Sequence, residues 1–556
     1  VTAAVIGKFE AEGIIRIDSV QKYRNPFSGS DRCGYEKPVL NDEQRYAATS
    51  IIKELFTDAR QKYLVHGITG SGKTEIYMEI IDEVIKRGKQ VIMLIPEISL
   101  TYQTVKRFYM RFGDRISIIN SRLSGGERYD QYLRIKRGEA DICIGPRSAV
   151  FAPFDRLGLI IIDEEHEGSY ISEQAPRYNT RDVAFKRAET EDAAVILGSA
   201  TPSLEAYTMA LSGRIKLFEV MKRANNALMP EIHIVDMREE LKKRNRSIFS
   251  GKLRELIEDR LEKKEQIMLF LNRRGYSGMI SCRACGHVIK CPHCDITLTV
   301  HNDGKMVCHF CGYTEPTAKL CPKCGSSYIG SFGIGTQKVE EMLKKDFPAA
   351  RVLRLDADTT KSKNGYEEIL SAFANEEADI LVGTQMIVKG HDFGKCTLVG
   401  ILVADMSLFS PDFRAGERTF QLLTQASGRA GRGKLKGDVV IQTYNPEHYC
   451  IENAAKADYR AFYNEEMAYR RIMDYPPAKC MLTILLQSVN EQYTSECSVK
   501  LAEYLKQKYL KNNSNKNKVN FFGIELIDNK EISLKRRDKK YVEILLIIFS
   551  INYFFN

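Results

Sequence analysis

Short apolar runs alternate with amphipathic stretches along most of this chain. Between Leu40 and Val220 the runs are KYLVHG, VIMLIPE, ADICIG, LGLIIIDEE and AAVILGSATP, and after Leu228 they are QIMLFLNRR, ARVLRLDAD, ADILVGTQ, TLVGILVAD and GDVVIQTY. Apolar strands separated by helices are typical of parallel sheets that carry helices on both faces. The pattern therefore predicts an α/β fold with two parallel-sheet lobes, and a smaller α+β domain over the last ~100 residues.

The same pattern sets the expected domain boundaries. We expect a linker at residues 28–39, the first lobe at 40–222, the second lobe at 223–281 and 325–445, a cysteine-rich insertion at 282–324, and the C-terminal domain at 446–556. In the last domain, KQKYLKNNSNKNKVN is rich in Lys and Asn and is expected to be a solvated loop. The apolar tail Ile544–Phe555 is about twelve residues long, and a membrane-spanning helix needs about twenty. We therefore expect a buried strand or an irregular tail there.

Composition narrows the class of protein. A chain of 556 residues is long enough for three to four domains at roughly 150 residues each. Its 44% hydrophobic and 28% charged residues are an ordinary globular balance, which excludes a wholly disordered or fibrous chain. The net charge of +10 permits a polyanionic partner but does not require one. The N-terminus, VTAAVIGKFEAEG, lacks the long apolar core of a secretory signal, so we expect a cytoplasmic protein.

Eight of the 14 cysteines fall in one stretch of 43 residues. They form four C-x-x-C pairs: Cys282/Cys285, Cys291/Cys294, Cys308/Cys311 and Cys321/Cys324. In a cytosolic chain, paired and closely spaced cysteines indicate metal binding rather than disulfides. Thiolates favour tetrahedral Zn²⁺, so eight of them make two four-thiolate sites with no open position for zinc catalysis. Spacing alone does not fix which pairs share an ion.

Iron–sulfur clusters or a redox function are the alternatives for this block. The interleaved Gly, Pro and His residues of CRACGHVIKCPHC favour a zinc ribbon over a ferredoxin-like arrangement. Because eight thiolates already suffice, we expect His287, His293 and His309 to be solvated loop residues. The short gap between Cys294 and Cys308 suits a ribbon folded on itself, with the outer pairs closing around it.

The segment Gly67–Thr74, GITGSGKT, satisfies the phosphate-loop pattern G-x-x-x-x-G-K-[ST]. It follows an apolar run and opens the amphipathic stretch EIYMEIIDEVIKRG, which is the context that the motif requires. The glycines Gly67, Gly70 and Gly72 let backbone N–H groups surround phosphates at a helix N-terminus. Lys73 is expected to pair with the β- and γ-phosphates of ATP, and the Thr74 hydroxyl to ligate Mg²⁺.

Two further segments offer the groups that nucleotide hydrolysis needs. The run LIIIDEEH ends in acids, of which Asp163 is expected to bind Mg²⁺ through water and Glu164 to polarise the attacking water. TQASGRAGR, in the second lobe, offers Arg429 and Arg432 three apart on one expected helical face as arginine fingers for the γ-phosphate. The alternatives are acids merely solvated at a strand end and arginines on an ordinary helix surface.

These motifs, with GSATPS at Gly198–Ser203, resemble those of superfamily 2 helicases in order and spacing. LIPEISLT, FLNRRGYS with the cysteine pairs directly after it, and GTQMIVKGHDF make the chain similar to the PriA family of replication-restart helicases over about residues 1–490. The resemblance implies two RecA-like lobes with the insertion inside the second. It also implies a nested zinc pairing, with one ion on Cys282, Cys285, Cys321 and Cys324 and the other on Cys291, Cys294, Cys308 and Cys311.

The resemblance also assigns roles to single residues. Gly198, Ser199 and Thr201 would couple hydrolysis to lobe movement, and Asp392 would face the nucleotide cleft. Gln44 would recognise adenine, the alternative being an ordinary polar residue at a helix start. The expected DNA contacts are Gly383, Thr384 and Gln385 on the strand track, and Tyr170, Arg177 and Tyr178 in an aromatic-rich loop. The tyrosines stack on bases in that interpretation, and pack against the surface in the other.

By resemblance, the chain is a 3′-to-5′ DNA helicase of replication restart that uses ATP, Mg²⁺ and two Zn²⁺. Its expected partners are single-stranded and forked DNA, primosome proteins and single-stranded-DNA-binding protein, with no membrane and a monomeric state. A non-unwinding scaffold with a degenerate ATPase is disfavoured by the intact Lys73, Asp163, Glu164, Arg429 and Arg432. An RNA helicase or a restriction-type translocase is disfavoured by the cysteine-rich insertion after FLNRRGYS.

The two ends of the chain depart from the family pattern. Members of the family carry a domain that captures a 3′ DNA end, followed by a winged helix. We expect the first to have no equivalent here and the second to persist only as a remnant at residues 1–27, which puts fork recognition in doubt. The tail from Phe521 onward lacks the Gly-Pro-Ala-Pro-like stretch of the family, so an incomplete C-terminal domain is expected.

Overall fold

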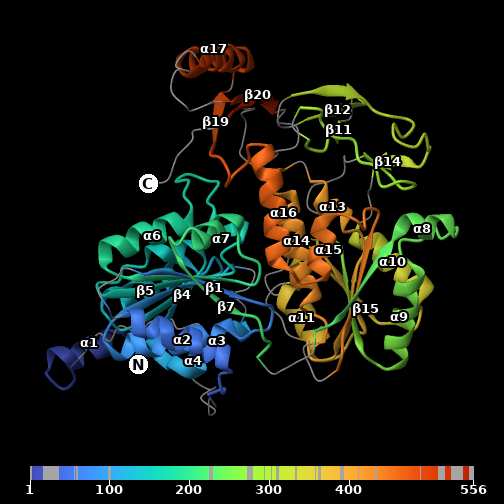
Figure 1. The fold of residues 1–556 in the computed structure, drawn as a ribbon. Coiled ribbons are helices and arrows are strands. Elements are labelled where there is room, and N and C mark those ends of the chain that lie inside the picture. The colour runs from blue at the N-terminus through green and yellow to red at the C-terminus, as the bar shows by residue number, and fades with distance from the viewer. Residues whose placement is uncertain are drawn as a thin grey trace. The chain divides into compact units, whose positions relative to one another are not determined.

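The computed structural model describes most of the chain as two compact units (Figure 1). The described residues are 3–16, 37–55, 57, 61–97, 102–224, 229–271, 280–293, 295–301, 304–308, 312–331, 335–356, 358–360, 365–388, 393–410, 412–431, 435–488, 490–510, 520–527 and 542–549. One unit comprises Val1–Val39, Met78–Asp163 and Glu167–Val195, and the other comprises Leu40–Tyr77, Glu164–His166 and Ile196–Asn556.

The first unit is built on four parallel strands in the order β3-β4-β2-β5. Every residue of β2 and β4 is buried, as expected of strands covered on both faces. Ser124 and Glu127 form a capping box that starts α5. The elements are α1 (Ala3–Ala11), β2 (Gln90–Leu94), α4 (Tyr102–Phe112), β3 (Ile116–Ile118), α5 (Gly125–Lys136), β4 (Ile142–Gly145), β5 (Leu157–Asp163) and α6 (Thr180–Glu191).

The second unit contains the strand that precedes the phosphate loop. Strand β1 pairs in parallel with β7 from Tyr63↔Lys216 to Gly67↔Val220. Helix α3 and strand β6 each contribute residues to both units. The elements here are α2 (Asp42–Leu55), β1 (Lys62–Gly67), α3 (Lys73–Lys86), β6 (Ala194–Ser199), α7 (Leu204–Leu211) and β7 (Lys216–Val220).

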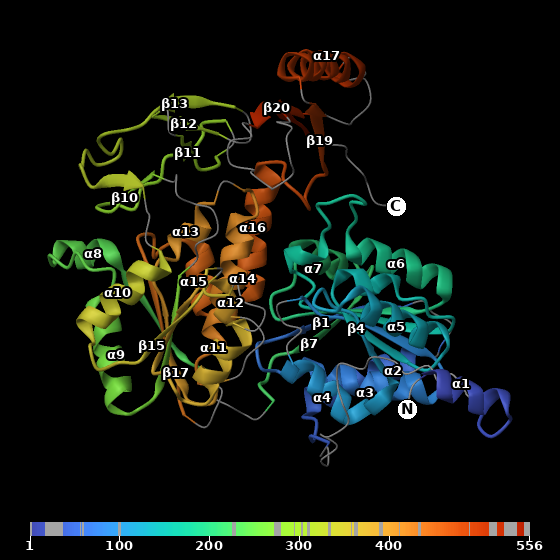
Figure 2. The ribbon, with the colours of Figure 1, turned by 180° about the vertical axis from the view of Figure 1, so that it is seen from behind.

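The second lobe is a six-stranded parallel sheet in the order β15-β16-β9-β17-β18-β8. Helices α9 and α10 lie on one side of this sheet, and α11, α14 and α15 lie on the other (Figures 1 and 2). Its strands are β8 (Glu231–Asp236), β9 (Gln266–Phe270), β15 (Val352–Leu355), β16 (Ile380–Gly383), β17 (Cys396–Ile401) and β18 (Asp438–Thr443). Its helices are α8 (Met237–Lys242), α9 (Gly251–Glu262), α10 (Thr336–Asp346), α11 (Gly365–Ala374), α12 (Gln385–Val388), α13 (Asp405–Leu408), α14 (Ala415–Ser427), α15 (Tyr449–Ala455) and α16 (Tyr459–Ile472).

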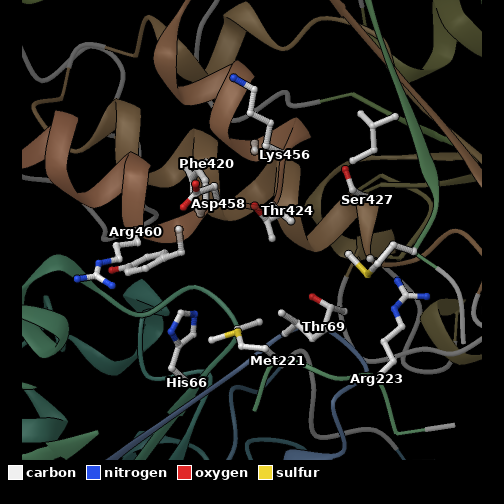
Figure 3. A pocket seen from close by; sticks show the side chains of 18 of the residues that line it. His66, Thr69, Met221, Arg223, Phe420, Thr424, Ser427, Lys456, Asp458 and Arg460 are labelled. Carbon is white, nitrogen blue, oxygen red and sulfur yellow. The ribbon is translucent and has the colours of Figure 1, made fainter. Parts of the chain in front are cut away.

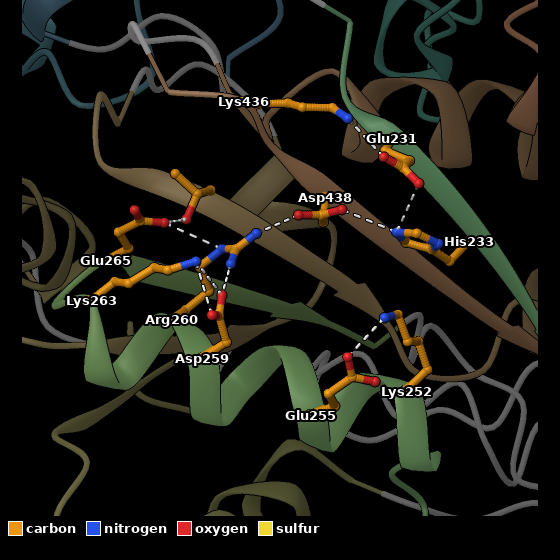
Figure 4. A network of polar contacts seen from close by, with 11 residues as sticks. Glu231, His233, Lys252, Glu255, Asp259, Arg260, Lys263, Glu265, Lys436 and Asp438 are labelled. Atoms are coloured by element: carbon orange, nitrogen blue, oxygen red, sulfur yellow. Dashed lines mark hydrogen bonds and ion pairs between the residues drawn. The ribbon is translucent and has the colours of Figure 1, made fainter.

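An ion-pair network joins α9 to the edge of this sheet (Figure 4). Arg260, 7% exposed, contacts Asp259 and Asp438 and lies 3.2 Å from Glu265. Asp438, at the start of β18, also lies 3.0 Å from His233 Nε2 on β8. Because a buried arginine needs charged partners, the network fixes α9 against β18 and β8.

The insertion and the C-terminal domain form small antiparallel sheets. In the insertion, β10 (Ile280–Cys282) pairs with β14 (Ile329–Ser331), and β11 (Thr299–Val300), β12 (Lys305–Val307) and β13 (Thr314–Pro316) form a three-stranded sheet. In the C-terminal domain, α17 (Glu491–Leu510) accompanies a sheet of order β19-β21-β20, with strands β19 (Met481–Ser488), β20 (Asn520–Ile527) and β21 (Val542–Phe549).

The structure confirms the α/β class, the parallel sheets, the insertion inside the second lobe and the α+β end. It corrects one local expectation: residues 506–510 of the Lys/Asn-rich stretch belong to α17, since EYLKQKYL continues a good helix-forming sequence. Of the other ten residues of that stretch, Asn520 begins β20, and 511–519 lie outside the described residues. Of the 1–27 remnant, residues 3–16 are described, and they begin with α1. No helix in the described part of the chain is long and apolar enough to cross a membrane.

Candidate nucleotide and metal sites

The phosphate loop, Gly67–Thr74, connects β1 to α3. Gly70 and Gly72 have φ angles of 82° and 77°, which glycine adopts without steric cost. A Cβ on Gly67 would lie 2.5 Å from Ser71 Oγ, so the loop has no room for a side chain there. Lys73 Nζ donates to the Gly67 carbonyl oxygen at 2.9 Å, and Thr74 is the second residue of α3. Glycine backbone, a lysine and a helix N-terminus are the groups that fit a phosphate.

Gln44, in helix α2, packs against this loop. It is 2% exposed, and its Nε2 donates to the Ser71 carbonyl oxygen at 2.7 Å. Its Oε1 accepts from Asn41 N at 2.8 Å, and Asn41 Oδ1 accepts from Gln44 N at 2.9 Å, so the two residues close the start of α2 reciprocally. A Cβ on Gly72 would collide with the Gln44 amide. Gln44 therefore caps the helix start, and its buried amide also contacts the phosphate loop.

Asp163 and Glu164 follow the apolar part of β5. Glu164 has a φ of 48°, a left-handed conformation that costs a non-glycine residue about 1 kcal/mol and concentrates at functional sites. Tyr170 donates its hydroxyl to the Asp163 carbonyl oxygen at 2.8 Å and is 4% exposed. Tyr170 therefore packs in the interior, whereas Arg177 is exposed and Tyr178 is half-buried.

His166 bridges two motifs that lie far apart in the sequence. Its Nδ1 lies 2.7 Å from Ser199 Oγ, and its Nε2 lies 2.9 Å from Nε2 of Gln425 on α14. Because an amide nitrogen only donates, His166 Nε2 accepts and the imidazole proton sits on Nδ1, toward Ser199. Ser199 Oγ also accepts from Thr201 N at 3.0 Å. Neither His166 nor Gln425 was assigned a role from the sequence, because their contact joins residues 259 positions apart.

The phosphate loop meets the end of α14 directly. A Cβ on Gly428 would lie 2.5 Å from Thr69 Cγ2, so this glycine permits the close approach. Helix α14 ends at Ser427, and Arg429 lies in the turn beyond it, with its N–H donating to the Ala426 carbonyl oxygen at 3.0 Å. The expectation that Arg429 and Arg432 share a helical face is therefore wrong.

Two glycines approach each other closely after the end of α14. Gly431 has a φ of 64°, and a Cβ on it would lie 2.6 Å from Gly437 N, where the chain returns toward β18. Arg432 and Asp392 lie outside the described residues. Of the expected strand-track residues, Gly383 ends β16 and is buried, and Gln385 starts α12, with Thr384 between them.

A cavity of about 380 Å³ adjoins the phosphate loop (Figure 3). One end of the cavity is aromatic. There the centroid of the Tyr459 ring lies 5.0 Å from that of His66 and 4.9 Å from that of Tyr207. At the other end, within the described part of the chain, the buried hydroxyl oxygens of Thr69 and Ser427 lack a hydrogen-bond partner. Such groups bind water when the site is polar and roomy enough. Burial, and then Lys73, lower the pKa of His66 to about 4.

Four cysteines of the insertion come together. The sulfurs of Cys282, Cys285, Cys321 and Cys324 all lie within 4.8 Å of one another, with Cys282 Sγ 3.7 Å from Cys324 Sγ and Cys285 Sγ 3.6 Å from Cys321 Sγ. A tetrahedral zinc with Zn–S of about 2.3 Å separates its sulfurs by about 3.8 Å. The four thiols therefore fit one zinc ion.

The first cysteine of each inner pair begins the same kind of turn as the first cysteine of each outer pair. In all four cases, the residue after the pair has a positive φ and donates its N–H to the carbonyl oxygen of the first cysteine. These four residues are Gly286, Asp295, Gly312 and Gly325, and their donor–acceptor distances are 2.8, 2.9, 2.9 and 2.8 Å. Cys291 and Cys308 are buried in one apolar cluster, whereas Cys294 and Cys311 lie outside the described residues. The same turn therefore follows the first cysteine of all four pairs.

Three family comparisons match separate parts of the chain. The family described as "Type III restriction enzyme, res subunit" matches residues 37–204, and the family described as "Helicase conserved C-terminal domain" matches residues 329–434. Between them, the "PriA DNA helicase Cys-rich region (CRR) domain" matches residues 291–316. The first two contain the phosphate loop and Arg429, and the third contains the inner cysteine pairs.

Curated relatives named replication restart protein PriA match most of the chain. The relative from Bacillus subtilis is 49% identical over 506 residues, 91% of this chain and 63% of the relative. Those from Synechocystis and Haemophilus influenzae are 41% and 38% identical, covering 88% and 92% of this chain and 60% and 70% of the relatives. The chain thus spans less than two thirds of the length of the first two.

Solved structures resemble this chain more distantly. The structure titled "Structure of RecG bound to three-way DNA junction" matches at a TM-score of 0.46 and 15% identity, over 83% of this chain and 48% of that one. Family membership therefore rests on the sequence relatives.

Proposed function

Because this chain belongs to the family of replication restart protein PriA, we propose that it is an ATP-dependent DNA helicase moving 3′ to 5′ along one strand. The observation that carries the proposal is the direct approach of the phosphate loop to the end of α14, at Thr69 and Gly428. A motor needs this juxtaposition, because charge compensation from the second lobe has to reach a nucleotide bound on the first.

Each residue of the nucleotide site has a proposed task. Lys73 would hold the β- and γ-phosphates, Thr74 and Asp163 would hold Mg²⁺, and Arg429 and Arg432 would face the γ-phosphate. Bound Mg²⁺ supplies charge neutralisation on the phosphates. Glu164 orients and polarises the attacking water, and its left-handed backbone supports that role. Gln44, with its amide already on the phosphate loop, would recognise adenine.

His166 and Gln425 would transmit the nucleotide state between the lobes. His166 follows Glu164 by two residues and contacts both Ser199 and Gln425. A change in the tilt of the acidic segment therefore alters hydrogen bonds to GSATPS and to α14 at once. This supports the assignment of Ser199 and Thr201 to coupling.

The cysteine-rich insertion is proposed to hold two structural zinc ions in the nested pairing. Cys282, Cys285, Cys321 and Cys324 would hold one, and Cys291, Cys294, Cys308 and Cys311 the other. The repeated turn and the sulfur separations support this pairing. Four thiolates around each ion leave no position for a substrate, so the zinc would shape the insertion without reacting.

The proposed substrates are single-stranded and forked DNA, and the proposed role is primosome assembly and reloading of the replicative helicase at abandoned forks. Primosome proteins and single-stranded-DNA-binding protein are the proposed partners of a monomer in the cytoplasm. The role is supported by the name of the relatives, replication restart protein PriA, and the substrates and partners by the family resemblance of the sequence.

Strand separation on tailed duplexes tests the proposal. With ATP and Mg²⁺, we expect unwinding of a duplex with a 3′ single-stranded tail and little unwinding of the same duplex with a 5′ tail. A forked duplex with a free leading-strand end, measured beside them, reports fork preference. Equal separation of both tailed substrates, or separation without ATP, would contradict the proposed directional motor.

A further inference from the structure

Glu417 on α14 is a carboxylate with almost no contact with solvent. It is 5% exposed, and its two oxygens accept from different segments: Oε1 from the Leu204 N–H at 3.0 Å, and Oε2 from Arg470 Nη2 at 3.1 Å. Leu204 is the first residue of α7, directly after Gly198–Ser203. One side chain therefore joins that segment to α16.

Arg470 anchors the other end of this contact. It is fully buried, and all three of its nitrogens are engaged: with Glu417, with Glu466 Oε1 at 2.7 Å, and with the Pro476 carbonyl oxygen at 2.5 Å. Glu466 accepts a further hydrogen bond from the Tyr449 hydroxyl at 2.6 Å. A guanidinium held at three nitrogens has a single orientation, so movement of its partner is not absorbed by rotation of the side chain.

Gly416 permits the close packing that this arrangement needs. A Cβ at this position would lie 2.6 Å from Glu466 Oε2 and 3.2 Å from Cys450 Sγ. Helix α14 therefore approaches α15 and α16 at the residue beside Glu417. Solvent cannot enter to replace the ion pair.

The start of α7 is also held from the acidic segment. Glu165 Oε1 accepts from Ser203 N at 2.6 Å, and Glu165 Oε2 accepts from Ser203 Oγ at 3.0 Å. Glu165 directly follows Glu164, the proposed water-polarising residue. The first turn of α7 thus lies between a carboxylate from the nucleotide side and the carboxylate of Glu417.

The contacts continue from Arg470 to the cysteine-rich insertion. The Arg470 guanidinium carbon lies 5.0 Å from the centroid of the Phe413 ring, which stacks on Tyr475 at a centroid distance of 5.0 Å. Both rings belong to one apolar core with the insertion residues Ile280, Ile289, Cys291, Ile296, Leu298, Met306 and Cys308. Successive contacts through Glu417, Arg470 and Phe413 therefore connect the end of the GSATPS segment to the insertion.

We propose that Glu417 and Arg470 are a positioning pair that couples movement of the segment Gly198–Ser203 to α16 and to the cysteine-rich insertion. The inference rests on the proposed helicase function and names the residues through which the motor acts on the insertion. Separating Glu417 from Arg470 leaves a buried carboxylate without its guanidinium, whereas Arg470 keeps Glu466. The start of α7 and α16 therefore move together.

The charge of Glu417 gives the pair a pH dependence. The groups that face it are Glu205 on α7 and Tyr459, Glu466 and Arg470 on α16. Burial, and then Glu205, raise the pKa of Glu417 to about 7. The ionised form that pairs with Arg470 gains population as the pH rises, so coupling increases between about pH 6 and pH 8.

The test compares the full chain with Glu417→Gln and with Tyr463→Phe. Glutamine keeps an acceptor for the Leu204 N–H but removes the charge opposite Arg470. Phenylalanine at 463 removes a different contact to α7, the 2.9 Å hydrogen bond between the Thr208 and Tyr463 hydroxyls, and serves as the matched control. The readouts are ATP hydrolysis without DNA, ATP hydrolysis with single-stranded DNA, duplex unwound per ATP hydrolysed, and zinc content.

We expect Glu417→Gln to keep its DNA-free hydrolysis and its zinc content, and to lose on the order of tenfold in duplex unwound per ATP. The increase in duplex unwound per ATP between about pH 6 and pH 8 should also disappear. Tyr463→Phe should keep all four readouts within about twofold. Arg470→Lys is the second variant, for use if Glu417→Gln folds poorly. It keeps the positive charge but loses the planar guanidinium, and it should show the same selective loss. Unchanged unwinding per ATP, or a parallel fall of every readout, overturns the proposal. If ATP hydrolysis by the wild-type protein is not stimulated by DNA, the result contradicts the proposed helicase function and not the role of Glu417 and Arg470.

Discussion

His66, at the end of β1, shows how burial sets the state of a single residue. It is 4% exposed, beside the rings of Tyr207 and Tyr459, and burial and then Lys73 lower its pKa to about 4. The folded protein therefore holds a neutral imidazole where the unfolded chain takes up a proton below about pH 6.5. Neutrality matters here, because a second cation would repel Lys73 beside the phosphate loop.

The lowered pKa of His66 predicts acid sensitivity. Its contribution to stability is fully present above about pH 6.5 and is lost as the pH falls toward the folded pKa of about 4. Each tenfold difference in proton affinity is worth about 1.4 kcal/mol, so the loss is bounded at about 3 kcal/mol. Thermal unfolding should show the melting temperature of His66→Gln falling less than that of wild type between about pH 7 and pH 5. His301→Gln is the control, and identical pH slopes in all three proteins would rule out this role.

Local signatures made some residues predictable and left others hidden. Lys73, Gly70, Gly72 and the cysteines stand in short motifs whose spacing already states their chemistry. His166 and Glu417 act through partners that lie 259 and 213 residues away, Gln425 and Leu204. A contact that the fold creates across such a separation leaves no periodic or spaced pattern in the sequence.

At the scale of elements, apolar runs predicted the buried central strands and the edge strand β15, whereas the edge strand β8 was not predicted. Strands β2, β4 and β9 are buried throughout and are written as continuous apolar runs. Strand β8 lies at the edge of its sheet, where none of its six residues is fully buried, and its sequence EIHIVD carries charge at both ends. Strand β8 pairs with one neighbour only, and its sequence lacks the apolar run that marks the central strands.

The four C-x-x-C turns are the elements that predict metal content. Because the same positive-φ residue and hydrogen bond follow each pair, we expect two zinc equivalents per chain by elemental analysis. Cys321→Ser and Cys291→Ser should each lower the content to about one equivalent. Cys480→Ser, at an exposed cysteine outside the insertion, should leave it at two. One equivalent in the wild type, or iron in place of zinc, would refute the two-site assignment.

At the scale of the whole molecule, the account depends on segments brought together from distant parts of the chain. Thr69 of the phosphate loop lies against Gly428, and His166 contacts Gln425. The alternation of strands and helices predicted both lobes, but their contacts through α7, α14 and α16 emerge only from the folded structure. The chain spans 63% of its Bacillus subtilis relative.

ATP hydrolysis with and without single-stranded DNA tests the central claim, that this chain is a DNA-driven motor, most directly. Wild type, Lys73→Ala and the matched control Lys86→Ala, at the exposed far end of α3, are measured side by side. Removing the Lys73 ammonium takes away the charge proposed to hold the β- and γ-phosphates. We expect DNA-stimulated turnover in wild type and Lys86→Ala, and its loss in Lys73→Ala. Turnover that DNA does not raise, equal in wild type and Lys73→Ala, would contradict it.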